Sequence, residues 1–451
     1  GGGGEDDCDE PPCEPPPGGG PNAPTTVYEY DARDRLIRVR QPWQGAGGGE
    51  AVTTYSYDPQ DHLVAVTDAE GNTTSYQYSD RDVMTREVSP VSGTTTYTYN
   101  EHGELISETD ARGVAVTRTV DVLGRATFVD SPDPTLDTTY TYDDPAVPFS
   151  KGRLTAIARD GATVAYAYDR FGRAVQDGEL TYSYDPNGNR TEIGYPGGVV
   201  ARYGHDFADR EASLEIETGS GAPLPIVTAA GYEPLGPLSS LTLGNGLPET
   251  REFTSRYLPA SINVPGRLKQ TYTTDAVGNI RAIDRAVGPD RFLATYAYQD
   301  PQYFLTEGNG AWGRRAWSYD RIGNRLAEEV VPPDADIPES YSYGYSPNFA
   351  GGNTPTLSRI EPAPGGELGS RLDYRYDAAG DQTEVETIDA ECGRRTSFLD
   401  SSAERRLARL HTSDGTGTTE LSYDGRGFLR RSRLTFSTSN DFVQTEPIYS
   451  S

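Results

Sequence analysis

The chain has 451 residues with 68 acidic and 40 basic side chains, which gives a formal net charge of −28. This acidic balance argues against nucleic acid or an anionic lipid surface as a partner, and no apolar run reaches the length of about 18 residues that a membrane-spanning helix needs. The 30 tyrosines, 50 glycines and 33 prolines favour frequent turns and burial through amphipathic rings.

Residues 1–24 differ in composition from the rest of the chain, because they are mostly glycine, proline and acidic residues. Such a segment cannot bury enough apolar surface to fold, so we expect a flexible linker. Cys8 and Cys13 lie here with four residues between them. In an exported chain they could close a disulfide, and unpaired thiols or a partner outside the chain are the alternatives. Cys392 is interpreted as unpaired or as a packing residue, and no cysteine spacing fits a metal site.

From residue 25 onward one short pattern recurs: an aromatic, any residue, a tyrosine, an acid, and a turn glycine three residues after the acid. The clearest copies are Tyr166, Tyr168, Asp169 and Gly172; Tyr182, Tyr184, Asp185 and Gly188; Trp317, Tyr319, Asp320 and Gly323; and Tyr374, Tyr376, Asp377 and Gly380. In looser copies the second aromatic returns after 21 residues, as at Tyr57, Tyr78 and Tyr99. A recurring unit predicts an array, in which these residues have a structural role.

Each copy predicts a β-hairpin, because aromatics two residues apart lie on one face of a strand. In the segment from Asp185 to Gly188 the acid caps its own turn, and glycine takes the left-handed position of a three-residue hairpin loop. Tyr168 and Tyr184 are only 16 residues apart, and we attribute this to a two-residue turn at Asp177-Gly178. The sequence therefore predicts an all-β array of hairpins.

This array resembles the YD-repeat, or RHS (rearrangement hotspot), family. The resemblance rests on the Tyr-x-Tyr-Asp-x-x-Gly copies and on the Gly-Asn-Arg variants at 188–190 and 323–325, and it covers roughly residues 28–430. It implies a long antiparallel sheet that spirals into a partial or complete hollow shell. In relatives such shells enclose a C-terminal toxin, in bacterial polymorphic effectors and Tc toxins, or serve cell-surface recognition, in teneurins. A secreted or cell-surface location follows as an expectation.

Spacing of the repeats suggests how the rest of the chain is organised. We expect regular YD repeats over 25–205, degenerate repeats over 206–270, regular repeats over 271–330, an irregular insertion over 331–371, and C-terminal repeats over 372–451. The insertion is rich in proline and glycine, so we predict loops that project from the sheet. Such loops could serve recognition, or they could be an insertion without a function that the fold tolerates at a repeat junction. Since the chain opens without methionine and ends within a repeat spacing, we expect a truncated piece of a longer parent.

Residues able to carry chemistry are few. His62, His102, His205 and His411 fall at repeat positions or lack metal spacing, and the segment from Asp68 to Asn72, although faintly similar to a calcium loop, fits a repeat turn better. The family's closing Asp-Pro-x-Gly-Leu motif is absent. We therefore predict no catalytic residue, no metal and no cofactor, and any enzymatic activity would lie in a C-terminal toxin region absent from this chain.

Two functional hypotheses remain open. In the first, the chain is a non-enzymatic shell segment of an exported RHS/YD-repeat protein that encapsulates or presents a C-terminal cargo or toxin. In the second, it is an extracellular scaffold that binds glycans, cell wall or a partner protein. The acidic side chains could form a solvated surface or a lumen that complements a basic cargo. A closed or nearly closed sheet favours containment, and an open ribbon favours binding.

Overall fold

The computed structural model describes residues 25–445 except positions 46, 220, 300, 336, 349–350, 364–368, 390–392, 414, 416 and 437–441. The predictions for the linker 1–24, for Cys8 and Cys13 and for Cys392 lie outside the described residues. Within the described part the chain forms 37 β-strands, two short 3-10 segments and no α-helix.

The strands fall into two parts, which we call the first coil (β1–β25) and the second coil (β26–β37). The first coil begins with β1 (Val27–Tyr30), β2 (Leu36–Pro42), β3 (Glu50–Tyr57), β4 (Leu63–Thr67), β5 (Thr73–Tyr78), β6 (Met84–Ser89), β7 (Gly93–Tyr99), β8 (Leu105–Thr109), β9 (Ala115–Val120), β10 (Ala126–Asp130), η1 (Pro134–Leu136), β11 (Thr138–Tyr142) and β12 (Leu154–Arg159). It continues with β13 (Ala162–Tyr168), β14 (Ala174–Asp177), β15 (Leu180–Tyr184), β16 (Arg190–Tyr195), η2 (Pro196–Gly198), β17 (Val199–His205), β18 (Glu211–Thr218), β19 (Leu224–Tyr232), β20 (Leu238–Leu243), β21 (Pro248–Phe253), β22 (Pro259–Val264), β23 (Leu268–Thr274), β24 (Ile280–Val287) and β25 (Asp290–Gln299). The second coil comprises β26 (Phe304–Gly310), β27 (Gly313–Tyr319), β28 (Arg325–Val331), β29 (Glu339–Pro347), β30 (Asn353–Pro362), β31 (Arg371–Tyr376), β32 (Gln382–Asp389), β33 (Gly393–Ser401), β34 (Leu407–Thr412), β35 (Gly417–Tyr423), β36 (Leu429–Phe436) and β37 (Phe442–Thr445).

One continuous antiparallel sheet contains all of these strands. Each strand pairs with the strand before it and the strand after it, from the β1–β2 pair to the β36–β37 pair. In the repeats that carry the Tyr-Asp pattern, the pairing shifts register at the tyrosine, as between Ser183 and Tyr184. These shifts are β-bulges, which bend a strand and increase its twist. The predicted array of hairpins in one long antiparallel sheet is confirmed.

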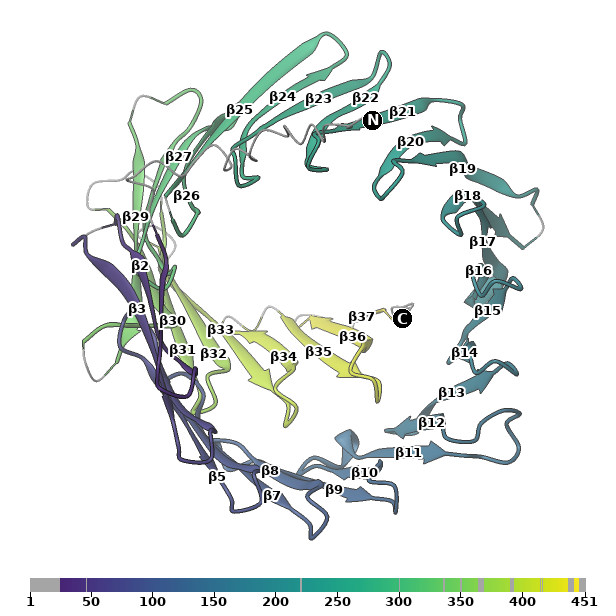
Figure 1. The fold of residues 1–451 in the computed structure, drawn as a ribbon, viewed down its shortest axis with the longest axis horizontal. Coiled ribbons are helices and arrows are strands. Elements are labelled where there is room, and N and C mark those ends of the chain that lie inside the picture. The colour runs from purple at the N-terminus through teal and green to yellow at the C-terminus, as the bar shows by residue number, and fades with distance from the viewer. Residues whose placement is uncertain are drawn as a thin grey trace, which may run out of the picture.

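The sheet winds into an open spiral (Figure 1). The first coil makes a ring, and the second coil returns beside the N-terminal strands before its last strands turn into the ring. Hydrogen bonds join the coils between residues that are 245 to 291 positions apart in the sequence. β1 and β37 are each paired on one side only among the described strands, so the spiral does not close on itself.

The wall is a single layer of sheet, and it has only a small core. Along β23 the exposed Lys269, Thr271 and Thr273 alternate with half-buried residues that include Tyr272. This alternation places the tyrosines on one face of the sheet. In the described residues the buried apolar side chains are Trp43, Ala51, Ile157, Leu180, Tyr182, Ile193, Ala201, Ala294 and Ala379. Stability must therefore come mainly from contacts between neighbouring repeats and between coils.

The prediction of projecting loops over 331–371 is wrong for residues 339–347 and 353–362, which form strands. β29 and β30 lie there and pair with each other over their length, so the insertion is a long hairpin of the sheet. Proline is tolerated in this strand because Pro355 lies where the pairing shifts, between the pairs Tyr345–Leu357 and Pro347–Asn353. A bulge leaves a residue outside the ladder, which is where a missing N–H costs least.

Two other regions differ in detail from the expectation. Strands continue without interruption through 206–270, although the tyrosine spacing is lost there. The predicted two-residue turn lies one residue later than expected, at Gly178-Glu179, because Asp177 still pairs with Leu180. Gly178 has a φ of 60°, which suits the first position of a tight hairpin turn. The remaining domain boundaries stay a prediction.

Candidate functional site: the cap turns of the wall

A five-residue turn joins the two strands of most repeats, and we call it the cap turn, numbered i to i+4 from its capping residue. The loop between β11 and β12 is longer and runs from Asp143 to Arg153. In the turn that begins at Asp169, the N–H of Asp169 donates to the carbonyl of Arg173 (3.0 Å), and the N–H of Gly172 donates to the carbonyl of Asp169 (2.9 Å). Position i+3 takes a positive φ, which L side chains rarely adopt. The glycines of the four clearest repeats have φ values of 85° (Gly172), 101° (Gly188), 91° (Gly323) and 81° (Gly380).

The capping carboxylate accepts hydrogen bonds from the turn that follows it. Asp169 Oδ1 accepts from the N–H groups of Phe171 (2.9 Å) and Arg173 (3.0 Å), and Asp169 Oδ2 accepts from Arg173 Nε (2.6 Å). The other three sequence-predicted acids are placed in the same way. Asp185 accepts from Gly188 and Asn189, Asp320 from Ile322 and Asn324, and Asp377 from Ala379 and Asp381. The capping acid therefore fixes the conformation of its turn, because its carboxylate accepts hydrogen bonds from that turn.

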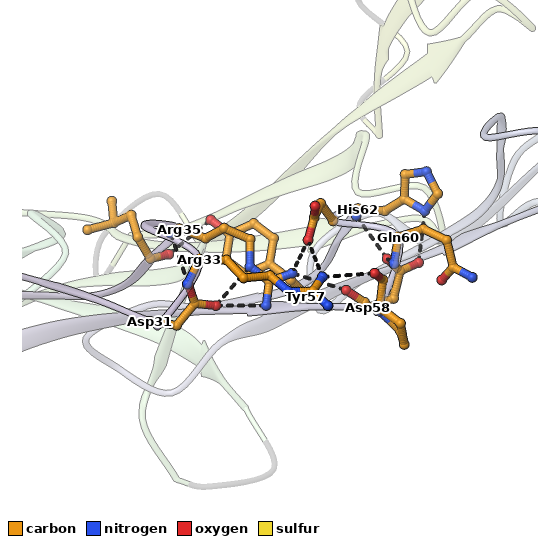
Figure 2. A network of polar contacts seen from close by, with 10 residues as sticks. Asp31, Arg33, Arg35, Tyr57, Asp58, Gln60 and His62 are labelled. Atoms are coloured by element: carbon orange, nitrogen blue, oxygen red, sulfur yellow. Dashed lines mark hydrogen bonds and ion pairs between the residues drawn. The ribbon is translucent and has the colours of Figure 1, made fainter.

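The first two repeats display this network at close range (Figure 2). Arg35 Nε donates to Asp31 Oδ2 (2.8 Å), and Arg35 Nη1 reaches the carbonyl of Asp58 in the next repeat (3.1 Å). The hydrogen bond from Arg35 lowers the pKa of Asp31 to about 2. The Arg35 guanidinium also lies 4.8 Å from the centre of the Tyr57 ring, a cation–π distance. One arginine thus joins its own cap turn to the following repeat.

The second tyrosine of a repeat bonds back to the repeat before it. Tyr57 donates its hydroxyl to the carbonyl of Leu36 (2.9 Å), and Arg35 lies over the same ring. Equivalent bonds run from Tyr168 to Leu154 (2.6 Å), Tyr184 to Ala174 (2.7 Å), Tyr319 to Leu305 (2.7 Å) and Tyr376 to Leu357 (2.7 Å). In the stretch 206–270, Arg210 still lies 4.6 Å from the Tyr232 ring. Tyrosine and arginine therefore form a ladder along the wall.

The first aromatic of each repeat packs within the sheet. Tyr182 is buried beside Leu180 and Ile193. Burial, followed by the charge of Asp177, raises the pKa of Tyr166 to about 12. In the other two clear repeats the first aromatic is Trp317 or Tyr374. The Trp317 ring centre lies 5.8 Å from the Arg325 guanidinium, and burial raises the pKa of Tyr374.

The cap turns of the second coil contact the opposite edge of the first coil, where the turns that join successive repeats lie. We call these the far turns. Arg112, in the far turn between β8 and β9, donates to the carbonyls of Ser402 (3.3 Å) and Ala403 (3.4 Å). It also lies 3.5 Å from the carboxylate of Asp381. Asp381 occupies position i+4, where most other acid-capped turns have arginine, histidine or asparagine. Two cations compensate for its charge, namely Arg405 of the next cap turn (2.9 Å) and Arg112 of the first coil.

Two further ion pairs join the coils along the same line. Arg159, which is only 4% exposed, donates to Glu404 (2.9 Å) and to the buried Thr138 hydroxyl (2.8 Å). Arg426 Nη1 donates to Asp177 Oδ1 (2.7 Å), and the Asp177 side chain is 7% exposed. Charges this deeply buried are tolerated only when they are paired. These residues hold the second coil on the first.

The backbones of the two coils also approach closely. A Cβ atom on Gly380 would lie 2.8 Å from the carbonyl oxygen of Val91, and one on Gly93 would lie 2.7 Å from the carbonyl oxygen of Ala378. Neither distance leaves room for a side chain. Small residues at this edge therefore let the turns of one coil fit against those of the other.

Two of the four histidines, His62 and His411, stack on aromatic rings. His62 stacks on Tyr78 with 4.5 Å between ring centres and bonds Asp58 (2.8 Å), and His411 stacks on Phe398 at 4.9 Å. In the part of the chain that the structure describes, no group of three or more His, Cys, Asp or Glu residues could hold a metal ion. Over the same residues, no helix is long and apolar enough to cross a membrane.

Sequence reasoning missed the residues that join the coils, among them Arg112, Arg159, Glu404 and Arg426. A signal was present for two of them. Arg112 and Arg426 stand at position i+2 of acid-capped turns that have no arginine at i+4, whereas Arg33, also at i+2, is followed by Arg35 at i+4. An arginine displaced by two positions still reaches its own acid, as Arg426 reaches Asp424 (2.9 Å), but it also points a second donor outward.

Known proteins support the same fold. Residues 20–175 match the Teneurin YD-shell family. The crystal structure of TcdB2-TccC3 without its hypervariable C-terminal region matches with a TM-score of 0.69 at 14% identity, over 95% of this chain and 25% of that chain. The Tc holotoxin pore of Photorhabdus luminescens matches with a TM-score of 0.59 at 14% identity, over 94% of this chain and 25% of that chain. No curated protein matches this chain.

These matches confirm the resemblance to the RHS/YD-repeat family that the tyrosine and acid pattern indicates. The chain spans about a quarter of the length of the solved structures that it matches. It is a segment of structural shell, and its fold is that of the Tc toxin shell.

Proposed function

Because this chain has the YD-repeat wall of the RHS/YD-repeat family, we propose that it belongs to an exported protein whose wall surrounds a polypeptide cargo, such as a C-terminal toxin segment. The wall itself catalyses no reaction. Its task is to separate the cargo from solvent and proteases until delivery.

The overlap of the two coils is the observation that carries this proposal. A ribbon that only displays a binding surface has no need to return beside its own start. This wall completes a turn and is then fixed there by Arg112, Arg159 and Arg426. Buried ion pairs are costly to desolvate, so their use at this edge supports a role in keeping two coils in register.

The test uses the longest natural chain that contains this segment. A cryo-electron microscopy map should show polypeptide density inside the wall, and a protease should leave that cargo intact. In an Arg159→Ala/Arg426→Ala variant the coils should separate and the protease should reach the cargo. Arg40→Ala is the matched control, because Arg40 pairs with Glu29 and Glu50 within the first coil. Cargo that is cut equally fast in the wild type would refute containment.

One feature favours the binding scaffold as a second candidate. Strands β23 to β27 border a hollow of about 410 Å³ whose lining includes exposed aromatic rings. Tyr296 and Trp312 stack there with 6.5 Å between ring centres, beside Arg285 and Gln270. Aromatic faces next to polar donors suit sugar rings. A soluble cell-wall oligosaccharide should then change tryptophan fluorescence in the wild type but not in Trp312→Ala. No change in either protein would remove this candidate.

A further inference from the structure

One stretch of the cap-turn edge presents apolar side chains to solvent. In the first coil, the cap turns at Asp185 and Thr254 have Pro186-Asn187 and Ser255-Arg256 at positions i+1 and i+2, but five other cap turns between Asp121 and Asn279 carry large exposed apolar residues at position i+1 or i+2. These residues are Val122 (102% exposed), Leu123 (70%), Phe171 (65%), Phe207 (113%), Leu235 (87%) and Val277 (56%). Single exposed apolar residues are normal, but a row of them along one edge marks an interaction surface.

The same positions are covered in the second coil. Ala379, at i+2 of its cap turn, is 1% exposed, because the far turns of the first coil lie against it. Glu404 and Arg426, also at i+2, pair with Arg159 and Asp177 of the first coil. Position i+2 is therefore the contact position between coils. The exposed row is an earlier part of the same edge.

We infer that the exposed row is a docking edge for the far turns of a second copy of this chain. The interface would continue the one already present, since the far turns up to Gly178 seat the second coil and those that follow lie on the same edge of the sheet. They are short and rich in glycine and proline, as at 196–198 and 219–223. Leu224 and Trp312, which flank or lie in far turns, are 61% and 45% exposed and supply apolar contacts.

Such an interface joins two different edges, so it is heterologous. A heterologous contact that does not close into a ring adds copies without limit. The net charge of −28 opposes close approach of two copies, so raising the salt concentration should strengthen the association by screening. This inference does not depend on the containment of a cargo, because it concerns only the edges of the wall.

Sedimentation velocity over a range of concentration and salt tests the inference on the chain itself. The weight-average mass of the wild type should rise with concentration to at least about twice the monomer value. Leu123→Asp/Phe207→Asp, on the cap-turn edge, and Leu224→Asp, on the far edge, should each remain monomeric. Leu293→Asp is the control, because Leu293 is 58% exposed on strand β25. Circular dichroism of every variant checks the fold.

A mixture gives the sharpest result. The cap-edge variant and the far-edge variant each keep one intact edge, so together they should form a dimer and nothing larger. A wild type that stays monomeric at its highest soluble concentration and in high salt would overturn the inference. So would a Leu293→Asp control that loses association as completely as the two edge variants.

Discussion

Contacts within a coil and contacts between coils are built in different ways. Within a coil the same chemistry repeats: an acid caps its turn, an arginine or asparagine at i+4 commonly bonds the acid, and a tyrosine bonds the repeat before it. Between coils each junction is different, with Arg112 on backbone carbonyls, Arg159 on Glu404 and Arg426 on Asp177. The first kind makes an array, and the second turns the array into a spiral. The difference predicts which changes act locally and which act on the whole wall.

The largest effect is expected at the coil junction. Glu404→Ala leaves the Arg159 guanidinium buried without its carboxylate, and the free energy of unfolding should fall by about 3–5 kcal/mol. Thermal or denaturant unfolding measures the loss. Glu50→Ala is the control, because Glu50 forms an exposed ion pair with Arg40 and should change stability by less than about 1 kcal/mol. Equal losses of unfolding free energy in the two variants would mean that the ion pair of Arg159 with Glu404 does not stabilise the contact between the coils.

A smaller effect is expected when a single cap turn is strained. Gly188 has a φ of 101°, so Gly188→Val should lower the free energy of unfolding by roughly 1–3 kcal/mol. Ser183→Thr, on the exposed face of the same hairpin, should be nearly silent. Hydrogen exchange should place the damage in this repeat and its neighbours and leave the coil junction unchanged. Damage that spreads to the second coil would contradict a nearest-neighbour array.

Removing one tyrosine hydroxyl from the ladder of tyrosine and arginine should lower the free energy of unfolding by a smaller amount. Tyr168→Phe deletes the hydroxyl that donates to Leu154 and leaves that carbonyl without this donor, so the free energy of unfolding should fall by about 1 kcal/mol. Thermal midpoints compare this variant with Tyr30→Phe, in which the replaced ring is 57% exposed. A loss in Tyr30→Phe as large as that in Tyr168→Phe would show that the rung adds nothing.

The smallest effect per residue is expected from the capping aspartates, whose contribution to stability is lost at low pH. Hydrogen bonds from Arg35, Arg125 and Arg210 lower the pKa values of Asp31, Asp121 and Asp206. A group whose pKa is lower in the folded state stabilises the fold above its unfolded pKa, and this stability is lost as the pH falls through the folded pKa. The thermal midpoint should therefore drop as the pH falls from about 5 to about 2.

Asp121→Asn separates this acid effect from the turn itself. Asn100 shows that an amide can cap the turn, because its Oδ1 accepts from the N–H groups of His102 (2.9 Å) and Glu104 (3.0 Å). The variant should be slightly less stable near neutral pH and should lose less stability in acid than the wild type. A variant with an unchanged acid dependence would show that the charge of Asp121 contributes nothing.

The array was predictable from sequence because its determinants are local. The acid at 185 and the glycine at 188 specify a turn wherever they occur, and a tyrosine two residues after another aromatic specifies a strand face. The bond from Tyr57 to Leu36 was not foreseen, because a pattern of residues does not say which backbone oxygen a hydroxyl reaches. The separation of donor and acceptor also varies, from 21 residues for Tyr57 to 10 for Tyr184.

The coil junction could not be predicted in the same way. Which residues meet after 245 or more positions depends on the curvature that many bulges and twists add up to, and a small error in each strand moves the meeting point by several repeats. The hairpin of β29 and β30 was mistaken for loops because proline and glycine indicate turns more often than bulges.

The cap turn that begins at Asp377 has a consequence for how the protein is made. Its position i+4 is the acid Asp381, which pairs with Arg405 of the next cap turn (2.9 Å) and also lies 3.5 Å from Arg112 of the first coil, 269 positions earlier. A ribosome adds about 5–20 residues per second, so Arg112 is synthesised roughly 15–50 s before the carboxylate that it pairs with. The far-turn edge of the first coil must therefore remain uncovered for this time during translation. The second coil then folds against that edge.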